Sequence, residues 1–227
     1  MIPLPEQPTI LEKKGSYAKF EIDGLYPGYG TTIGTALRRV LLSSLEGSAV
    51  TKVKIKGVEH EFSTIEGVAE DVVNIILNLK QLRFKSFSAE PQIATLKVKG
   101  EEDVNGGDFR LTSELELSNP DVHIATLTSK QSDLEMEITI EKGIGYDPVE
   151  RRKKEKLSIG EIMMDAIFNP VKKVSLAVEN TRVGERTDFD KVIIGVETDG
   201  TITPEEAFKQ ATDILVKTFT LLGELKK

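Results

Sequence analysis

Apolar and polar residues alternate with a period of two along most of the chain, as they do in half-buried strands. Over residues 17–23, for example, Ala18, Phe20 and Ile22 alternate with charged side chains. Turn sequences such as Asn105-Gly106-Gly107 separate the runs. The pattern therefore predicts antiparallel sheets. Further strands are expected at 49–58, 83–87, 93–98, 109–117, 123–127, 134–141, 171–179 and 192–198.

Helical periodicity is clear over residues 31–45, 68–80 and 203–226. The third helix has a composite start signal. Thr203 stands at the cap, Pro204 at the first helical position, and Glu206 completes a capping box. The apolar positions that follow lie along one flank for about 23 residues, or roughly 35 Å. Few helices among antiparallel strands predict an α+β fold.

The first predicted helix has two different faces. Its apolar residues, at about 100° per residue, share one broad face that needs a core. On the opposite side Arg38 and Arg39 bracket Leu42. A single exposed leucine is normal on a monomer, whereas arginine beside an apolar anchor is typical of an interface. The spacing leaves both interpretations open.

The glycines before this helix allow a rival hypothesis. Gly28, Gly30 and Gly34 resemble the loop of a dinucleotide- or phosphate-binding enzyme, in which backbone N–H groups hold a phosphate. Such a loop follows a buried parallel strand, but the run before Gly28 alternates like an antiparallel one. A tight turn and close backbone packing are therefore the favoured interpretation.

Composition narrows the function classes. The chain has 227 residues, enough for one large or two modest domains, and a formal net charge of -7. An acidic chain argues against nonspecific nucleic-acid binding, so partners are sought among proteins. Cysteine is absent, which excludes disulfides and thiolate sites. No signal peptide or membrane-length apolar run is present, so a cytoplasmic protein is expected.

No catalytic pattern stands out. His60 and His123 lack metal-ligand spacing and are expected to be packed or edge residues. Asp188 and Asp190 could suggest metal coordination, but ion pairing with the neighbouring basic residues explains them as well. The basic run at 150–156 is interpreted as a solvated loop rather than a binding site. We therefore predict a non-catalytic assembly protein without cofactor or metal, with the cofactor-binding enzyme as the alternative.

Four separated segments, 28–44, 57–64, 179–191 and 198–207, resemble the N-terminal domain of the bacterial-type RNA polymerase α subunit. Two departures are visible. Tyr26-Pro27 stands where the family usually has Glu-Arg, and Ile144 stands where it has Arg in a Gly-Arg-Gly-Tyr segment. The family continues through a linker to a small DNA-binding domain, so DNA contact is expected only through that domain or the assembled enzyme.

The resemblance implies a fold and an activity. The fold would be an antiparallel-sheet dimerisation domain with two main helices, residues 1–47 plus 172–227, interrupted by a mostly-β insert domain, 48–171. The protein would be a non-catalytic subunit of a nucleotidyltransferase. It would homodimerise and recruit the β and then the β′ subunit, with ω and sigma in the holoenzyme. It would be cytoplasmic, and nucleoid-associated only through the polymerase, with no membrane contact.

The resemblance also implies site residues. Those matching β- or β′-binding positions are Arg38, Arg39, Leu42, Lys80, Met164 and Val171. Helix one and the last helix would form the dimer contact, through Tyr29, Leu37, Val40, Leu41, Ile214, Leu215, Leu221, Leu222 and Leu225.

Overall fold

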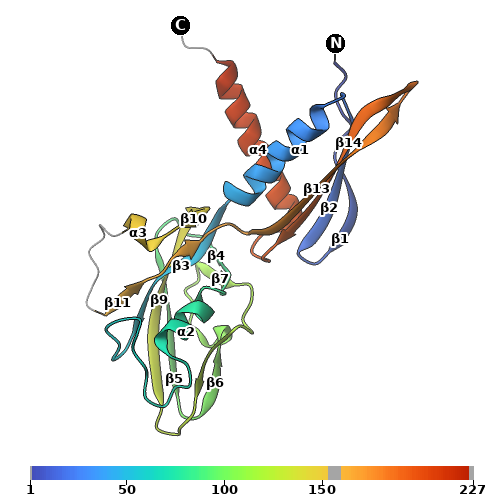
Figure 1. The fold of residues 1–227 in the computed structure, drawn as a ribbon. Coiled ribbons are helices and arrows are strands. Elements are labelled where there is room, and N and C mark those ends of the chain that lie inside the picture. Colours follow the sequence, from blue (N-terminus) through green and yellow to red (C-terminus); the bar gives the residue numbers. More distant parts are fainter. Residues whose placement is uncertain (1, 153–159, 225–227) are drawn as a thin grey trace. The chain divides into compact units, whose positions relative to one another are not determined.

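The structure is a computed structural model that describes residues 2–152 and 160–224. The chain divides into two compact units (Figure 1). We call Met1–Leu45 with Asn169–Lys227 the discontinuous unit, and Glu46–Phe168 the central unit.

The discontinuous unit is an antiparallel sheet packed against two helices. Its strand order is β1-β2-β14-β13. Alternate side chains of β2 are buried, among them Ala18, Phe20 and Ile22, as the alternation predicts. They form one core with the apolar faces of α1 and α4. The elements are β1 (Thr9–Lys14), β2 (Tyr17–Leu25), α1 (Tyr29–Ser43), β13 (Val171–Val183), β14 (Arg186–Thr198) and α4 (Pro204–Gly223).

The central unit is built on a six-stranded sheet with the order β5-β9-β3-β4-β7, in which β11 also pairs with β3. The pairings are antiparallel. The sheet strands are β3 (Glu46–Ile55), β4 (Phe84–Ser86), β5 (Gln92–Lys99), β7 (Leu115–Leu117), β9 (Asp133–Ile144) and β11 (Glu161–Met163). Two short pairs complete it, β6 (Glu102–Asn105) with β8 (His123–Leu127) and β10 (Tyr146–Asp147) with β12 (Ala166–Ile167). Its helices are α2 (Val72–Leu79), η1 (Gly106–Asp108) and α3 (Val149–Arg152).

Antiparallel sheets with few helices confirm the broad α+β prediction, but some boundaries were wrong. Helix α2 begins at Val72 rather than at 68. The Asp71 carboxylate accepts a hydrogen bond from Asn74 N at 2.7 Å and caps the helix there. Residues 109–114 are not a strand, although Phe109 and Leu115 are buried. The alternation of apolar and polar residues therefore arose there without a ladder of hydrogen bonds.

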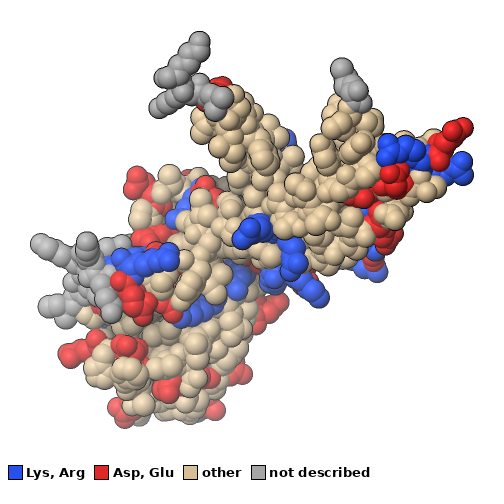
Figure 2. Space-filling model, turned by 45° about the horizontal axis from the view of Figure 1, so that its top comes forward, with Lys and Arg blue, Asp and Glu red and all other residues tan. Residues whose placement is uncertain are grey.

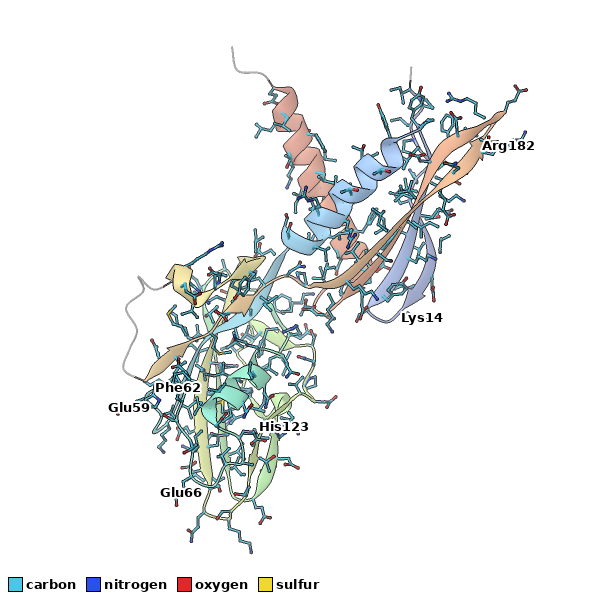
Figure 3. The ribbon with its side chains drawn as sticks, in the orientation of Figure 1. Lys14, Glu59, Phe62, Glu66, His123 and Arg182 are labelled. Atoms are coloured by element: carbon cyan, nitrogen blue, oxygen red, sulfur yellow. The ribbon has the colours of Figure 1, made fainter. Side chains whose placement is uncertain are left out.

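Strands β13 and β14 run further than predicted, to a hairpin whose tip region carries Arg182 (Figure 3). The side chains from Ala177 to Asn180 are all exposed, so no alternation marks that part of the strand. The capping box of α4 is confirmed. Glu206 N donates to Thr203 Oγ1 at 3.2 Å, and Thr203 N donates to Glu206 Oε2 at 2.9 Å. Within the described chain, no helix combines the length and apolarity needed to cross a membrane.

Candidate protein-binding surfaces

The glycine-rich turn before α1 is already occupied by a carboxylate of the same chain. Gly28 N and Gly30 N each donate a hydrogen bond of 2.9 Å to Asp190 Oδ2. Asp190 is 8% exposed. The free N–H groups at a helix start are what attract a phosphate, and here two of them face the Asp190 carboxylate instead. This geometry disfavours the nucleotide-binding hypothesis and supports the interpretation of close packing.

The ion-pair interpretation of Asp188 and Asp190 is half right. Arg186 Nε and Nη2 donate to the two Asp188 oxygens at 2.9 and 2.6 Å. Lys191 instead lies 3.5 Å from the carboxylates of both Glu21 and Asp23. The prediction for Asp190 was wrong, because its carboxylate caps the start of α1. Nothing in the local sequence distinguishes this cap from an ion pair, since Asp190 and Gly28 are far apart along the chain.

Helix α1 presents the outward face that its periodicity predicts. Leu37 and Leu41 are buried, whereas Arg38 and Arg39 are exposed and Leu42 is 38% exposed. We call Arg38, Arg39 and Leu42 the α1 patch. On the face drawn in Figure 2, basic side chains form separate groups interspersed with acidic ones. A single continuous basic surface, as expected for nonspecific nucleic-acid binding, is not seen on that face.

One face of helix α4 is buried near the start of the helix and exposed toward its end. Ala207 and Ala211, near its start, are both 0% exposed and lie in the core. The same angular face continues through Ile214 and Leu215, which are half-buried. It then reaches Leu221 and Leu222, which are 70% and 67% exposed. Figure 1 shows the distal half of this helix extending past the sheet of its own unit.

A groove of about 440 Å³ runs between α1 and the edge of α4. Its lining is mostly apolar and includes Thr32, Thr212 and Thr220. Val216 and Phe219, which line it, are 58% and 63% exposed. Together with the distal face of α4 this groove makes a continuous exposed apolar region, which we call the α1–α4 surface. Its further lining residues include Pro8, Ile33, Ala36, Leu37 and Phe208. Monomeric proteins rarely expose such regions unless they bind something.

In the central unit, Lys80 is held by an aspartate that sequence analysis did not single out. Lys80 Nζ donates to Asp165 Oδ2 at 3.0 Å, and Val149 N donates to Asp165 Oδ1 at 3.0 Å. The hydrogen bond from Val149 N, followed by that from Lys80, lowers the pKa of the Asp165 carboxyl below its usual value. Asp165 therefore carries its negative charge at neutral pH.

Comparison with known proteins now decides the family. A family model described as the RNA polymerase Rpb3/RpoA insert domain matches residues 53–169. The DNA-directed RNA polymerase subunit alpha of Alkaliphilus oremlandii is 50% identical over 214 residues, which cover 92% of this chain and 67% of that protein. This chain belongs to the family of DNA-directed RNA polymerase subunit alpha. The resemblance seen in the four sequence segments is thereby confirmed.

Two further members of the alpha family show similar identity to this chain and similar coverage. The subunit alpha of Symbiobacterium thermophilum is 49% identical over 91% of this chain, and the match covers 65% of that protein. That of Flavobacterium psychrophilum is 45% identical over 97% of this chain and 67% of that protein. The chain thus spans about two thirds of the length of the curated relatives it matches.

Not all of the residues that the resemblance predicts to bind β or β′ are accessible. Lys80 is partly exposed, but Met164 and Val171 are 1% and 5% exposed and belong to the cores of their units. Among the expected dimer residues, Tyr29 is 43% exposed, Leu37 and Leu41 are buried, and Val40 is half-buried. Leu225 lies outside the described residues. None of these contacts is tested by the relatives, so each stays a prediction.

The remaining candidates for chemistry have structural partners. His123, on β8 (Figure 3), has Nε2 2.8 Å from Glu70 Oε1, and Glu70 Oε2 accepts from Thr126 N at 2.7 Å. The His60 ring, which is exposed, is 3.2 Å from Ser63 Oγ. In the described part of the chain, no group of three or more acidic or histidine side chains is placed to hold a metal.

The basic run at 150–156 is only partly described, because residues 153–156 lie outside the described ranges. Where it is described, the expectation of a solvated loop was wrong for Arg152. Its side chain is 9% exposed, and its Nε lies 3.0 Å from Asp147 Oδ2. Arg151 is exposed, as expected.

Proposed function

We propose that this chain is the assembly platform of a DNA-directed RNA polymerase: it homodimerises through the α1–α4 surface and recruits the β and β′ subunits. The observation that carries the proposal is the change in exposure along one face of α4. Ala207 and Ala211 are fully buried, whereas Leu221 and Leu222, on the same face, are largely exposed. This face is largely apolar, interrupted by Thr218, and is covered only in its first half, which indicates a second protein surface.

A second copy of the chain can supply that surface. In a two-fold dimer every contact occurs twice, so one helix pair covers two exposed faces. Fully burying a leucine or phenylalanine contributes about 1.5–3 kcal/mol. Leu221, Leu222, Phe219 and Val216 are all more than half exposed, so even partial cover gives a substantial driving force. The dimerisation domain would then be the discontinuous unit, with the central unit as its insert.

The α1 patch is the proposed β-binding surface. Arg38, Arg39 and Leu42 lie on the face of α1 opposite its buried leucines, so binding there requires no rearrangement of the core. Arginine beside an apolar side chain is the composition of an interface anchor. The chain itself would perform no catalysis, and DNA would be reached through the assembled enzyme.

Size-exclusion chromatography with light scattering tests the proposal on the chain alone and with purified β. The expected results are a dimer of about 50 kDa, twice the 25.1 kDa of the chain, and a larger complex containing β. A chain that is monomeric at tens of micromolar and does not bind β would contradict the proposal. Saturable binding of NAD or ATP at micromolar affinity would instead support the alternative of a nucleotide-binding enzyme.

A further inference from the structure

The start of the chain is an extended segment that is apolar but uncovered. We call residues 2–8 the N-terminal arm. Every residue from Ile2 to Leu11 is exposed, and most of them are apolar or proline. Leu4 is 91% exposed. Terminal segments that stay in water are usually polar, whereas leucine and isoleucine gain free energy when they are buried. The composition of the arm therefore indicates that it packs on another surface.

The arm begins at the margin of the α1–α4 surface. Pro8 lines the groove of that surface together with Phe208 and Phe219. Just after the arm, Ile10 pairs with Phe20 in the ladder between β1 and β2. Opposed residues of a ladder share one face of the sheet, and Phe20 stacks on Phe208 of α4 with 4.7 Å between the ring centroids. Ile10 and Pro8 thus lie on the side of the sheet that carries the helices.

From Pro8 the arm runs along the edge of β2 rather than back over its own groove. Glu6 N donates a hydrogen bond to Asp23 O at 3.0 Å, which continues the pairing with β2 beyond the start of β1. The arm contains Pro3, Pro5 and Pro8. Each proline fixes its own φ and favours an extended residue before it. A stiff, extended segment of this kind loses little conformational entropy when it binds a partner.

We propose that the N-terminal arms are exchanged in the dimer, so that Ile2 and Leu4 of one copy pack on the distal face of α4 of the other copy. This inference rests on the proposed function, in which the second copy covers the α1–α4 surface. Leu4 lies four residues beyond Pro8, a reach of up to about 14 Å. Its target is apolar and uncovered in the single chain, since Leu221 and Leu222 are 70% and 67% exposed. Two-fold symmetry makes the exchange reciprocal.

Leu4→Asp tests the inference in the full chain, with the dimer dissociation constant measured by analytical ultracentrifugation over a dilution series. The Leu4 side chain is almost wholly exposed in the single chain, so the monomer tolerates an aspartate there. In the dimer two leucines would lose their cover, and we expect the dissociation constant to rise about a hundredfold. Gln7→Asp, exposed in the same arm, adds the same charge. It is the matched control and should dimerise as wild type.

Cross-linking identifies the chain that the arm contacts. The chain contains no cysteine, so an introduced cysteine is the only one in its copy. Pro3→Cys keeps Leu4, and Gly223→Cys lies beside Leu222 at a position with open space around it. In mixed dimers a short bismaleimide should join a Pro3→Cys chain to an affinity-tagged Gly223→Cys chain. Lys14→Cys, at the far end of β1, should not be joined to the tagged chain.

Three results would overturn the inference but leave the proposed function intact. The first is wild-type dimer affinity of Leu4→Asp, or equal cross-linking of the Lys14→Cys control. The second is normal dimerisation of Leu4→Asp with loss of β binding, which would assign the arm to β. The third is a lower melting temperature when Leu4→Asp is added to monomeric Leu222→Asp, which would show that the arm covers its own chain. If Leu222→Asp itself dimerises as wild type, the proposed α4 contact is wrong, and the arm exchange fails with it.

Discussion

At the scale of single residues, the start of α1 shows how a fold uses a sequence pattern that resembles a ligand site. Gly30 has no room for a side chain: an added Cβ would lie 2.8 Å from Asp190 Cβ and 2.9 Å from Val178 Cγ1. The glycine lets Asp190 approach closely enough to accept hydrogen bonds from Gly28 N and Gly30 N. The same N–H groups and the same glycine that suit a phosphate here bind a carboxylate from β14.

Gly30→Ala should therefore destabilise the discontinuous unit by about 1–3 kcal/mol, the usual cost of overpacking. Gly34→Ala is a matched comparison in the same helix. Its Cβ would meet Leu176 Cδ1 at 2.7 Å, but that methyl group belongs to a half-buried, flexible side chain. Alanine also gains about 1 kcal/mol of helix propensity over glycine. Urea unfolding should thus rank Gly30→Ala clearly below Gly34→Ala, and equal stabilities would show that Asp190 can move aside.

Arg39→Ala should leave folding and dimerisation unchanged and remove β recruitment. The Arg39 side chain is exposed, so truncating it opens no cavity. An arginine of the anchor type contributes about 2 kcal/mol or more, which is roughly thirtyfold in affinity. Titration of β against the variant measures this loss. Lys14→Ala, at the exposed end of β1 (Figure 3), is the control for loss of one cation. Wild-type yield of the β complex with Arg39→Ala would count against the α1 patch.

At the scale of elements, the sequence predicted best where burial follows one simple period. The predicted stripes of α1 and β2 match the buried residues, whereas that of α4 is buried only near its start, at Ala207 and Ala211. The start of α2 was misplaced because Val68 continues the helical spacing but forms a bridge to Leu127 instead. The distal part of α4 was predicted as an apolar flank. The position along α4 at which the flank becomes exposed was not predicted, because it depends on how far the sheet beneath extends.

Leu222→Asp is the test of that exposed flank. Leu222 is 67% exposed in the single chain, so an aspartate there is tolerated by the monomer. In a two-fold dimer each chain would bring one such aspartate to the contact. Two carboxylates would then be desolvated, at a cost of several kcal/mol. We expect a folded monomer at micromolar concentration, with wild-type circular dichroism and no complex with β. Lys217→Asp, exposed on the polar flank of the same helix, should remain dimeric. A Leu222→Asp dimer of unchanged affinity would place the contact elsewhere.

At the scale of the whole molecule, the candidate sites depend on contacts between distant parts of the chain. The α1 patch was predictable from helix angle because all three of its residues lie within one helix. The contacts of Asp165 were not predictable, because they join it to Lys80 and Val149, which are distant along the chain. No local sequence pattern indicates such contacts. Family resemblance pointed to Lys80 but also to Met164 and Val171, whose side chains are buried. A match in sequence thus does not by itself show that a side chain is accessible.

The division into two units leads to the last prediction, that the discontinuous unit folds and dimerises without the central one. Its own core contains β2, β13, β14, α1 and α4, and the proposed α1–α4 surface belongs to it entirely. The ends to be joined are close, because Asn169 Nδ2 donates to Leu42 O at 3.0 Å. Replacing residues 46–168 by a short Gly-Ser linker therefore shortens a long loop without straining the unit, and shorter loops cost less entropy to close.

The shortened chain should show cooperative unfolding and, by light scattering, a dimer with the affinity of the full chain. The same chain carrying Leu222→Asp should be a folded monomer, which ties dimerisation to α4 rather than to newly exposed surface. Affinity for β should fall but not vanish, because the α1 patch remains while Lys80 is lost. A shortened chain that folds but stays monomeric would show that the central unit contributes to the dimer contact, and the proposed dimerisation domain would then be wrong.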